Sequence, residues 1–147
     1  MIKIVDTEEE VLKLEQLRSK CMRSPRIIDN PRKTIYGEKI LNKEFIGLSL
    51  EEDNKLIGGC IVSTHFNHLY IEWLFTDFEY RKKGNASKLL NYIESNIEFF
   101  KKYYSIDSNK ILLEPYIAVE DFYKKNGYKN LDDTYMVKTI KKQKLLK

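Results

Sequence analysis

Hydrophobic and polar residues follow two different periods along this chain, and the change between the periods marks the expected elements. Alternation over residues 44–51, 56–64 and 68–76 predicts three strands, the last of them rich in aromatic and β-branched residues. From Ala86 to Tyr104 apolar residues recur every three or four positions, which predicts one amphipathic helix over 85–104. The middle of the chain is therefore expected to run from three strands into a long helix.

The N-terminal part of the chain shows the signals of a strand followed by two helices. Residues 2–5 read as a short strand, and Thr7 with the three glutamates after it supplies a cap and an acidic first turn for a helix that runs to Cys21. Residues 34–41 are expected to form the second helix. Within the alternating segment 56–64 that follows, Gly58 and Gly59 are expected to mark a bulge.

The third strand and the long helix lead to another apolar segment, 110–116, so that a strand–helix–strand unit is expected. Its crossover should be right-handed, and its ligand crevice should lie at the carboxyl ends of the strands. Pro115 cannot donate a ladder hydrogen bond and should lie where this strand separates from its neighbour. A helix over 119–126 and strands near Tyr128 and over 135–140 complete the expected elements.

Composition limits the size and the class of the protein. With 147 residues, of which 42% are hydrophobic, the chain is long enough for one cored domain, and we expect a single domain over 1–147 with a basic tail at about 141–147. A net charge of +4 suits a polyanionic small ligand without requiring a nucleic acid. The basic residues do not interleave with aromatic ones, so we expect no nucleic-acid partner.

Cysteine spacing and apolar run length indicate where the protein acts. Cys21 and Cys60 have neither disulfide nor metal-ligand spacing, which fits a reducing compartment and predicts no metal. No apolar run approaches the roughly 20 residues of a membrane span, and the charged N-terminus does not resemble a signal peptide. We therefore expect a cytoplasmic protein without a membrane partner, either a monomer or a homodimer.

The turn between the third strand and the long helix has the chemistry of a phosphate site. A helix start leaves backbone N–H groups unpaired at the positive end of its dipole, and Gly84 lacks the Cβ that would keep an anion at a distance. Arg81, Lys82 and Lys83 add positive charge. Such a turn is also compatible with an ordinary solvated loop when it is considered alone.

A second motif downstream makes the phosphate interpretation more specific. Residues 122–128, Phe-Tyr-Lys-Lys-Asn-Gly-Tyr, close a short helix with a glycine and open another strand. Together with Arg81, Gly84 and Ala86, this order of motifs resembles the GNAT superfamily of N-acetyltransferases over roughly residues 44–140. Tyr116 stands where many members carry an asparagine.

The resemblance implies a fold, a co-substrate and an activity. The expected fold is a mixed α/β sheet, mostly antiparallel, with one parallel βαβ unit and a splay between the fourth and fifth strands. The expected co-substrate is acetyl-coenzyme A, whose acetyl group passes directly to a primary amine of a small molecule or peptide, without a metal. The residues expected to contact the coenzyme are Leu74, Phe75, Thr76, Arg81, Lys82, Lys83, Gly84, Asn85, Ala86, Ser87 and Tyr123.

Three of these positions, and one nearby carboxylate, receive specific roles from the resemblance. The N–H of Leu74 is expected near the thioester oxygen and that of Thr76 on the pantetheine arm. Glu72 is expected to be the general base, and its alternative is a strand glutamate paired with a lysine. Tyr123 is expected to donate to the leaving sulfur, although it could also be a core residue.

The acceptor is expected at the first two helices and the loop between them. Arg23, Arg26, Arg32 and Tyr36 lie in that region. Arginines there would favour acceptors that carry a carboxylate or phosphate, and the alternative is that they are ordinary solvated arginines. The sequence does not name the acceptor. An alternative function is a catalytically silent acyl-coenzyme-A-binding module that acts as a sensor or interaction domain.

Overall fold

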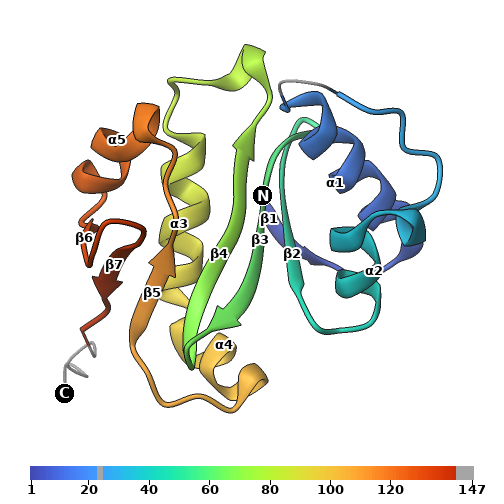
Figure 1. Cartoon of the computed structure of the whole chain (residues 1–147). Coiled ribbons are helices and arrows are strands. Elements are labelled where there is room, and N and C mark those ends of the chain that lie inside the picture. Colours follow the sequence, from blue (N-terminus) through green and yellow to red (C-terminus); the bar gives the residue numbers. More distant parts are fainter. Residues whose placement is uncertain (23–24, 142–147) are drawn as a thin grey trace, which may run out of the picture. The chain divides into compact units, whose positions relative to one another are not determined.

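The computed structural model describes residues 1–22 and 25–141, which include a seven-stranded sheet in the order β1-β2-β3-β4-β5-β7-β6 (Figure 1). The sheet is mostly antiparallel, and β4 and β5 form its parallel pair. The predicted mixed α/β fold is therefore confirmed. The described residues group into two compact units, the first comprising 1–63 and 72–92, the second 64–71 and residues from 93 onward.

The first unit begins with a capped helix, as the sequence predicts. After β1 (Ile2–Val5), α1 (Glu8–Lys20) starts with a reciprocal cap: the Thr7 Oγ1 accepts the Glu10 N–H at 3.2 Å, and the Glu10 carboxylate accepts the Thr7 N–H at 3.2 Å. The short 3₁₀ turn η1 (Pro31–Lys33) then precedes α2 (Ile35–Leu41). Both predicted helices are confirmed.

The core of the first unit lies between its helices and the sheet. β2 (Ile46–Glu52) pairs with β1 and with β3 (Lys55–His65), both antiparallel. Phe75 of β4 (His68–Thr76) is buried in the same core, and half-buried Trp73 packs against it, as expected for a core tryptophan. The buried residues of this core cluster are Val5, Val11, Leu14, Leu17, Ile40, Ile61 and Phe75.

The expected bulge between β2 and β3 is displaced by one residue. The register shifts between Leu50 and Glu51, whose partners are Gly58 and Leu56, so Ile57 is the extra residue. Gly59 is required for close packing and not for the bulge, because a Cβ there would lie 2.5 Å from Leu14 Cδ1 and 2.6 Å from Phe75 Cζ. The helix and the strand can approach only where this side chain is missing.

The single long helix expected over 85–104 is two helices in the structure. α3 (Asn85–Ser95) and α4 (Ile97–Tyr104) are separated at Asn96, whose φ of −113° and ψ of 25° lie outside the helical region. The apolar residues still recur with helical spacing across the break, which explains why the periodicity alone predicted one helix. Asn96 then accepts the N–H groups of Phe99 and Phe100 and starts the second helix.

The second unit contains the parallel pair and the C-terminal strands. Leu69, Tyr70 and Ile71 of β4 pair with Ile111, Leu112 and Leu113 of β5. β5 also pairs with β7, which pairs with β6. The remaining elements of this unit are β5 (Lys110–Leu113), η3 (Ile117–Val119), α5 (Glu120–Lys125), β6 (Lys129–Asn130) and β7 (Met136–Thr139).

β5 is shorter than the segment 110–116 that its apolar residues predicted. Its pairing with β4 ends at the residue pair Ile71–Leu113, two residues before Pro115. β4 continues beyond that pair to Thr76. Because Pro115 has no N–H to donate, the ladder cannot extend through it. The splay between the fourth and fifth strands that the sequence predicted is thus present.

Candidate active site

The turn that follows β4 is fixed to the sheet by buried polar contacts. Asp77 is 3% exposed, its N–H donates to the carbonyl of Ile57 at 2.8 Å, and its own carbonyl accepts the Tyr80 N–H at 2.8 Å. The Lys20 ammonium at the end of α1 donates to both oxygens of the Asp77 carboxylate, at 3.1 and 3.3 Å. Burial favours a higher pKa for Asp77, but this ion pair outweighs it, so the pKa lies below its ordinary value.

The backbone of the turn has two left-handed residues. Lys82 has a φ of 61° and Gly84 a φ of 79°. A Cβ built on Gly84 would meet no atom within 4 Å, so the space in front of this residue is open. Alternating backbone conformations of this kind turn neighbouring N–H groups toward one side and form a concave anion site. The predicted phosphate cradle fits this geometry.

The basic side chains of the turn are more constrained than their sequence suggests. Arg81 donates its Nε–H to the carbonyl of Thr76 at 2.9 Å, and its guanidinium lies 3.8 Å from the centroid of the Phe78 ring. Lys83 has its ammonium 5.6 Å from the Tyr80 centroid. Arg81 is therefore anchored to the turn through one nitrogen, and its remaining N–H groups carry its positive charge at an exposed position.

The side chain of Asn85 stabilises the turn from within and does not project into solvent. Its side chain is 5% exposed and donates to the carbonyl of Tyr80 at 2.9 Å. The Lys88 N–H donates to the carbonyl of Gly84, which is the first helical hydrogen bond of α3. Ala86 and Ser87, in the first turn of this helix, are half-buried. The N–H groups at the start of α3, which have no partner within the helix, thus follow directly after Gly84.

Four of the predicted site residues lie in order along the end of β4. Glu72 and Leu74 are half-buried, whereas Phe75 and Thr76 are buried. All four lie beyond Ile71, where the pairing with β5 ends. The Thr76 carbonyl accepts hydrogen bonds from Arg81 and from the Cys21 thiol, the latter at 3.5 Å. The backbone of this strand segment lies outside the ladder with β5 and leads directly into the turn before α3.

The Cys21 contact is a feature that the sequence did not reveal. Cys21 lies 55 residues from Thr76 along the chain, and the chain signals nothing about their proximity. Burial of the thiol raises the pKa of Cys21 above its ordinary value, although Arg81 opposes this change. The group therefore stays protonated and acts as a hydrogen-bond donor to the strand end.

Tyr123 belongs to the second unit, where it lies in α5. It is 9% exposed, and its ring packs against Tyr128 with the centroids 5.8 Å apart. Its carbonyl accepts the N–H groups of Asn126 and Tyr128, each at 3.0 Å, which closes α5 at the motif 122–128. Gly127 follows with a φ of 90°, a left-handed conformation that suits glycine at a helix end.

The region expected to receive the acceptor is ordered by a buried ion pair. The guanidinium of Arg18 donates to Glu15 at 2.6 and 3.0 Å and lies 4.7 Å from the Tyr36 centroid and 5.1 Å from the Trp73 centroid. Tyr36 thus packs against the core. Exposed Arg32 pairs with Glu8 at 2.8 Å. Arg26 is exposed, and Arg23 lies outside the described residues.

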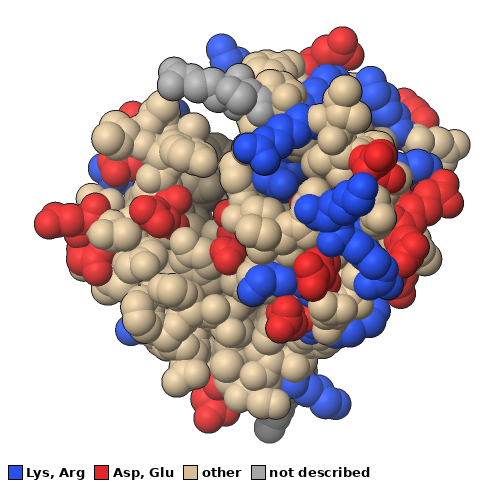
Figure 2. Space-filling view, turned by 45° about the vertical axis from the view of Figure 1, so that its right-hand side comes forward, with Lys and Arg blue, Asp and Glu red and all other residues tan. Residues whose placement is uncertain are grey.

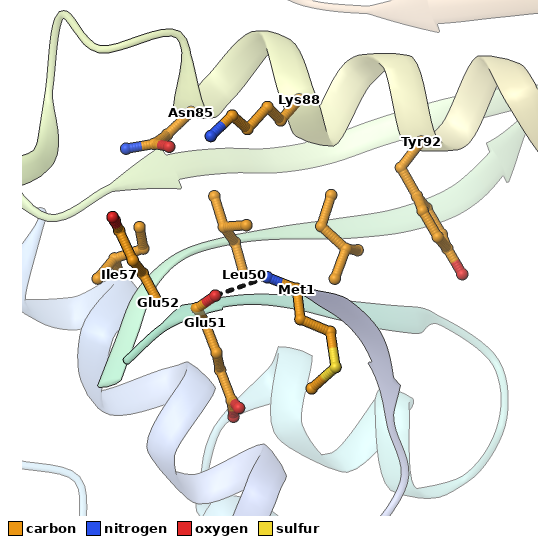
Figure 3. Close-up of a pocket in the computed structure, with 9 residues that line it drawn as sticks. Met1, Leu50, Glu51, Glu52, Ile57, Asn85, Lys88 and Tyr92 are labelled. Atoms are coloured by element: carbon orange, nitrogen blue, oxygen red, sulfur yellow. Dashed lines mark hydrogen bonds between the residues drawn. The ribbon is translucent and has the colours of Figure 1, made fainter. Parts of the chain in front are cut away.

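A pocket of about 410 Å³ lies between β2, β3 and α3 (Figure 3). Leu50 and Ile57 contribute apolar surface, and Lys88 on α3 and Glu52 at the end of β2 lie on opposite sides of it. Asn85 is the residue that the pocket shares with the predicted coenzyme site. Its volume is in the range of small-molecule sites.

Charged side chains of both signs are interspersed on the face shown in Figure 2. Exposed pairs of opposite charge, such as Arg32 with Glu8 at 2.8 Å, leave little net local field. Among residues 1–22 and 25–141, every helix is too short or too polar to cross a bilayer. The six residues 142–147, which make up most of the expected basic tail, lie outside the described part of the chain.

Comparison with known proteins decides the family. A family model described as the acetyltransferase (GNAT) domain matches residues 44–130, which is more than half of the chain. The chain belongs to the GNAT family. It is accordingly an acyltransferase, and the resemblance seen in its two motifs is confirmed. A search of curated protein sequences gave no match.

Solved structures of this family share the fold. An aminoglycoside 6'-N-acetyltransferase complexed with coenzyme A has a TM-score of 0.71 at 18% identity, with 98% of this chain and 99% of that chain covered. The Escherichia coli ribosomal-protein-S18-alanine N-acetyltransferase has a TM-score of 0.67 at 13% identity, with coverages of 99% and 97%. The PaiA N-acetyltransferase of Thermoplasma acidophilum, in complex with coenzyme A, has a TM-score of 0.62 at 23% identity, with coverages of 95% and 99%.

Proposed function

We propose that this GNAT protein transfers the acetyl group of acetyl-coenzyme A to a primary amine by direct attack. The observation that carries the proposal is the cradle after β4, where left-handed Gly84 faces open space at the start of α3. A pyrophosphate is an anion of the right kind for such a site, because exposed helical N–H groups and lysines can both neutralise it. Two of the solved relatives are complexed with coenzyme A.

In the proposed reaction the amine nitrogen attacks the carbonyl carbon of the thioester. The N–H of Leu74 stabilises the negative charge that develops on the carbonyl oxygen. The C–S bond then breaks, the electron pair leaves with the sulfur, and Tyr123 donates a hydrogen bond to the thiolate. Glu72 accepts the proton that the attacking amine must lose, directly or through a water molecule. No covalent intermediate on the protein is required.

Other groups hold the co-substrate without taking part in bond changes. The Thr76 N–H would bind the pantetheine arm, and residues Arg81 to Ser87 would bind the pyrophosphate. Asn85 contributes by closing the turn through Tyr80, and Arg81 contributes by fixing the Thr76 carbonyl. We further propose a cytoplasmic monomer or homodimer that acts on small-molecule or peptide amines.

A coenzyme-thiol release assay across a panel of amines tests this proposal. The panel should include alkylamines, arylalkylamines, polyamines, aminoglycosides, amino acids and peptides with a free N-terminus. We expect amine-dependent thiol release with at least one class, and its loss in a folded Gly84→Glu variant. Tight acetyl-coenzyme A binding with no release from any amine would instead favour a catalytically silent binding module.

A further inference from the structure

The side chain of Lys138 in β7 joins the ends of two helices within the second unit. Its ammonium donates to Oε1 of Glu94, in the last turn of α3, at 2.6 Å and to the carbonyl of Asn126, at the end of α5, at 2.8 Å. All three residues belong to the second unit. A lysine near the C-terminal end of a helix is favourable, because it meets carbonyl groups that lack a partner within the helix. One cation therefore ties α3, α5 and β7 together.

The glycine of the motif 122–128 leaves room for this lysine. A Cβ on Gly127 would lie 2.9 Å from Lys138 Cε and 3.1 Å from Lys138 Nζ. The left-handed φ of Gly127 already favours glycine, and the close passage of the lysine side chain is a second, independent reason for it. The motif and the lysine of the following strand therefore fit each other.

The hydrogen bond from Lys138 bears directly on the backbone that carries Tyr123. The Asn126 N–H donates to the Tyr123 carbonyl at 3.0 Å, and the Asn126 carbonyl accepts from the lysine. A second connection runs through the rings: the Lys138 ammonium lies 5.9 Å from the Tyr128 centroid, and the Tyr128 ring packs on that of Tyr123 at 5.8 Å. Lys138 thus reaches Tyr123 through one intervening residue by either route.

The ion pair of Lys138 with Glu94 is more buried than an ordinary surface pair. The side chains of Glu94 and Lys138 are 14% and 25% exposed. Among residues 1–22 and 25–141, the second carboxylate oxygen of Glu94 is buried and has no hydrogen-bond partner. Without the ammonium this carboxylate would lose its counter-ion and the Asn126 carbonyl would lose this donor. Both losses are costly in a partly buried site.

We propose that Lys138 is a positioning residue for Tyr123: it fixes the end of α5 and so holds the phenol where it can donate to the leaving sulfur. This inference rests on the proposed function, which gives Tyr123 that role. Placement matters because a hydrogen bond weakens steeply when its donor is misaligned, and a displacement of about 1 Å can cost about 10² fold in rate. In this proposal Lys138 acts only through the backbone of α5 and the Tyr128 ring.

A double-mutant cycle in the thiol-release assay tests the coupling. Lys138→Met keeps most of the aliphatic side chain and removes the donor. It should lower kcat about 3- to 20-fold and change the affinity for acetyl-coenzyme A less than about twofold. Tyr123→Phe, which should lower kcat in the wild-type background, should cost less than about twofold more in Lys138→Met, because the hydroxyl is already misplaced. Additive losses would overturn the inference and leave Lys138 with a role in stability alone.

A charge-balanced variant separates positioning from stability. Glu94→Gln combined with Lys138→Met removes both charges, so no uncompensated carboxylate remains. The melting temperature should recover about half or more of the drop seen in Lys138→Met. The Asn126 carbonyl still lacks its donor, so turnover should stay as low as in Lys138→Met and should stay insensitive to Tyr123→Phe. Recovery of turnover together with stability would overturn the inference. This variant also replaces Lys138→Met if the latter does not fold.

Lys101 of α4 supplies the matched control within the same unit. Its side chain is 13% exposed, and its ammonium donates to Asn109 at 2.7 Å and to Glu98 at 3.4 Å. Lys101→Met should lower the melting temperature as well, but its effect on kcat should combine additively with that of Tyr123→Phe. If Lys101→Met abolished the effect of Tyr123→Phe as completely, any loss of stability would have this result, and a specific role of Lys138 would be rejected.

A spectroscopic measurement separates failure of this inference from failure of the proposed function. In protein labelled with 3-fluorotyrosine, the fluorine NMR signal that is absent from Tyr123→Phe belongs to Tyr123. We expect this signal to shift or broaden in both Lys138→Met variants and to stay unchanged in Lys101→Met. A shift without any effect of Tyr123→Phe on turnover would uphold the placement of Tyr123 by Lys138 and reject the proposed role of Tyr123 in transfer. An unchanged signal would overturn the inference, whatever the turnover.

Discussion

Glu72 is the residue on which the proposed proton transfer depends. It is half-buried and directly follows Ile71, which forms the last residue pair of the ladder between β4 and β5. Glu72→Gln keeps the size of the side chain and removes its basicity. Turnover should fall by about 10² to 10⁴ fold near neutral pH, because general-base catalysis contributes on that scale. Affinity for acetyl-coenzyme A, measured by calorimetry, should be nearly unchanged.

The same variant has a pH signature. The loss in kcat should shrink as the pH rises, since a larger fraction of the amine is then already neutral. Glu52→Gln, an exposed carboxylate of the first unit outside the predicted catalytic set, is the control and should keep wild-type turnover. Equal activity of Glu72→Gln and wild type near pH 7 would assign the proton to water or to another carboxylate such as Glu114.

Tyr123 should contribute only modestly to the rate of the proposed transfer. A thiol has a pKa of about 8.5 and a phenol about 10, so a thiolate leaves fairly well without a proton from tyrosine. One hydrogen bond to the sulfur is worth about 1–2 kcal/mol, or roughly 5 to 30 fold in rate. Tyr123→Phe should therefore be slower in steady-state turnover but clearly active. Its ring should still pack on Tyr128, so circular dichroism should report an unchanged fold.

Two outcomes would change this assignment of Tyr123. A turnover within twofold of wild type would give the residue a packing role alone. Complete inactivity with coenzyme still bound would mean that the phenol delivers a proton in the rate-limiting step. Tyr103→Phe, which alters a tyrosine of α4, is a suitable control for the substitution itself.

Among the elements, α1 shows how a helix end is stabilised by local sequence and by one distant residue. Its cap joins Thr7 and Glu10, as the sequence predicts. The Glu10 carboxylate also pairs with Lys3 of β1 at 3.0 Å, a contact that depends on how the helix packs on the strand. The ion pair with Lys3, opposed by partial burial and helped by the N–H groups of Asp6 and Thr7, lowers the pKa of Glu10 from 4.5 to about 2.

This depressed pKa predicts an acid-dependent loss of stability. The folded-state value lies below the unfolded one, so the contribution is complete above about pH 4.5 and is lost as the pH falls toward 2. Because both partners are partly exposed, we expect it to be about 1 kcal/mol. Urea unfolding of wild type should lose that much more between pH 5 and 2 than Glu10→Gln, which retains a capping side chain. Parallel pH curves would contradict the role of this carboxylate.

For the whole molecule, binding of the co-substrate should couple to folding. A ligand at about 100 times its dissociation constant adds about 2.7 kcal/mol to the free energy of unfolding. For a chain of 147 residues this corresponds to a rise of about 5–10 °C in melting temperature with acetyl-coenzyme A. Gly84→Glu should remove the rise, because it places bulk and negative charge in the open space before the cradle.

The control for this experiment must separate strain from lost binding. Gly84 has a φ of 79°, so any side chain there costs backbone energy and should lower the melting temperature without ligand. Gly84→Ala shares that cost but adds neither charge nor a long side chain. It should retain part of the ligand-induced rise. An undiminished rise in folded Gly84→Glu would show that the coenzyme binds elsewhere.

Local chemistry along the chain was sufficient to predict the family and most of the helices and strands. The alternation in β2, β3 and β4, the cap at Thr7 and the glycine turns at Gly84 and Gly127 each depend on residues that are neighbours in sequence. Such features form through backbone preferences and hydrogen bonds within a few residues, so they can be read without coordinates. The two motifs that identify the GNAT family are features of this kind.

Tertiary packing decided what joins residues far apart in the chain. The ion pair of Lys20 with Asp77, the anchoring of Cys21 on Thr76 and the gathering of His65 with Tyr135 each span more than 50 residues. The end of β5 and the break between α3 and α4 also escaped the periodicity, because apolar spacing continues across both. Hydrophobic periodicity states which residues are buried, whereas the partner that each buried group meets is chosen by how the elements pack.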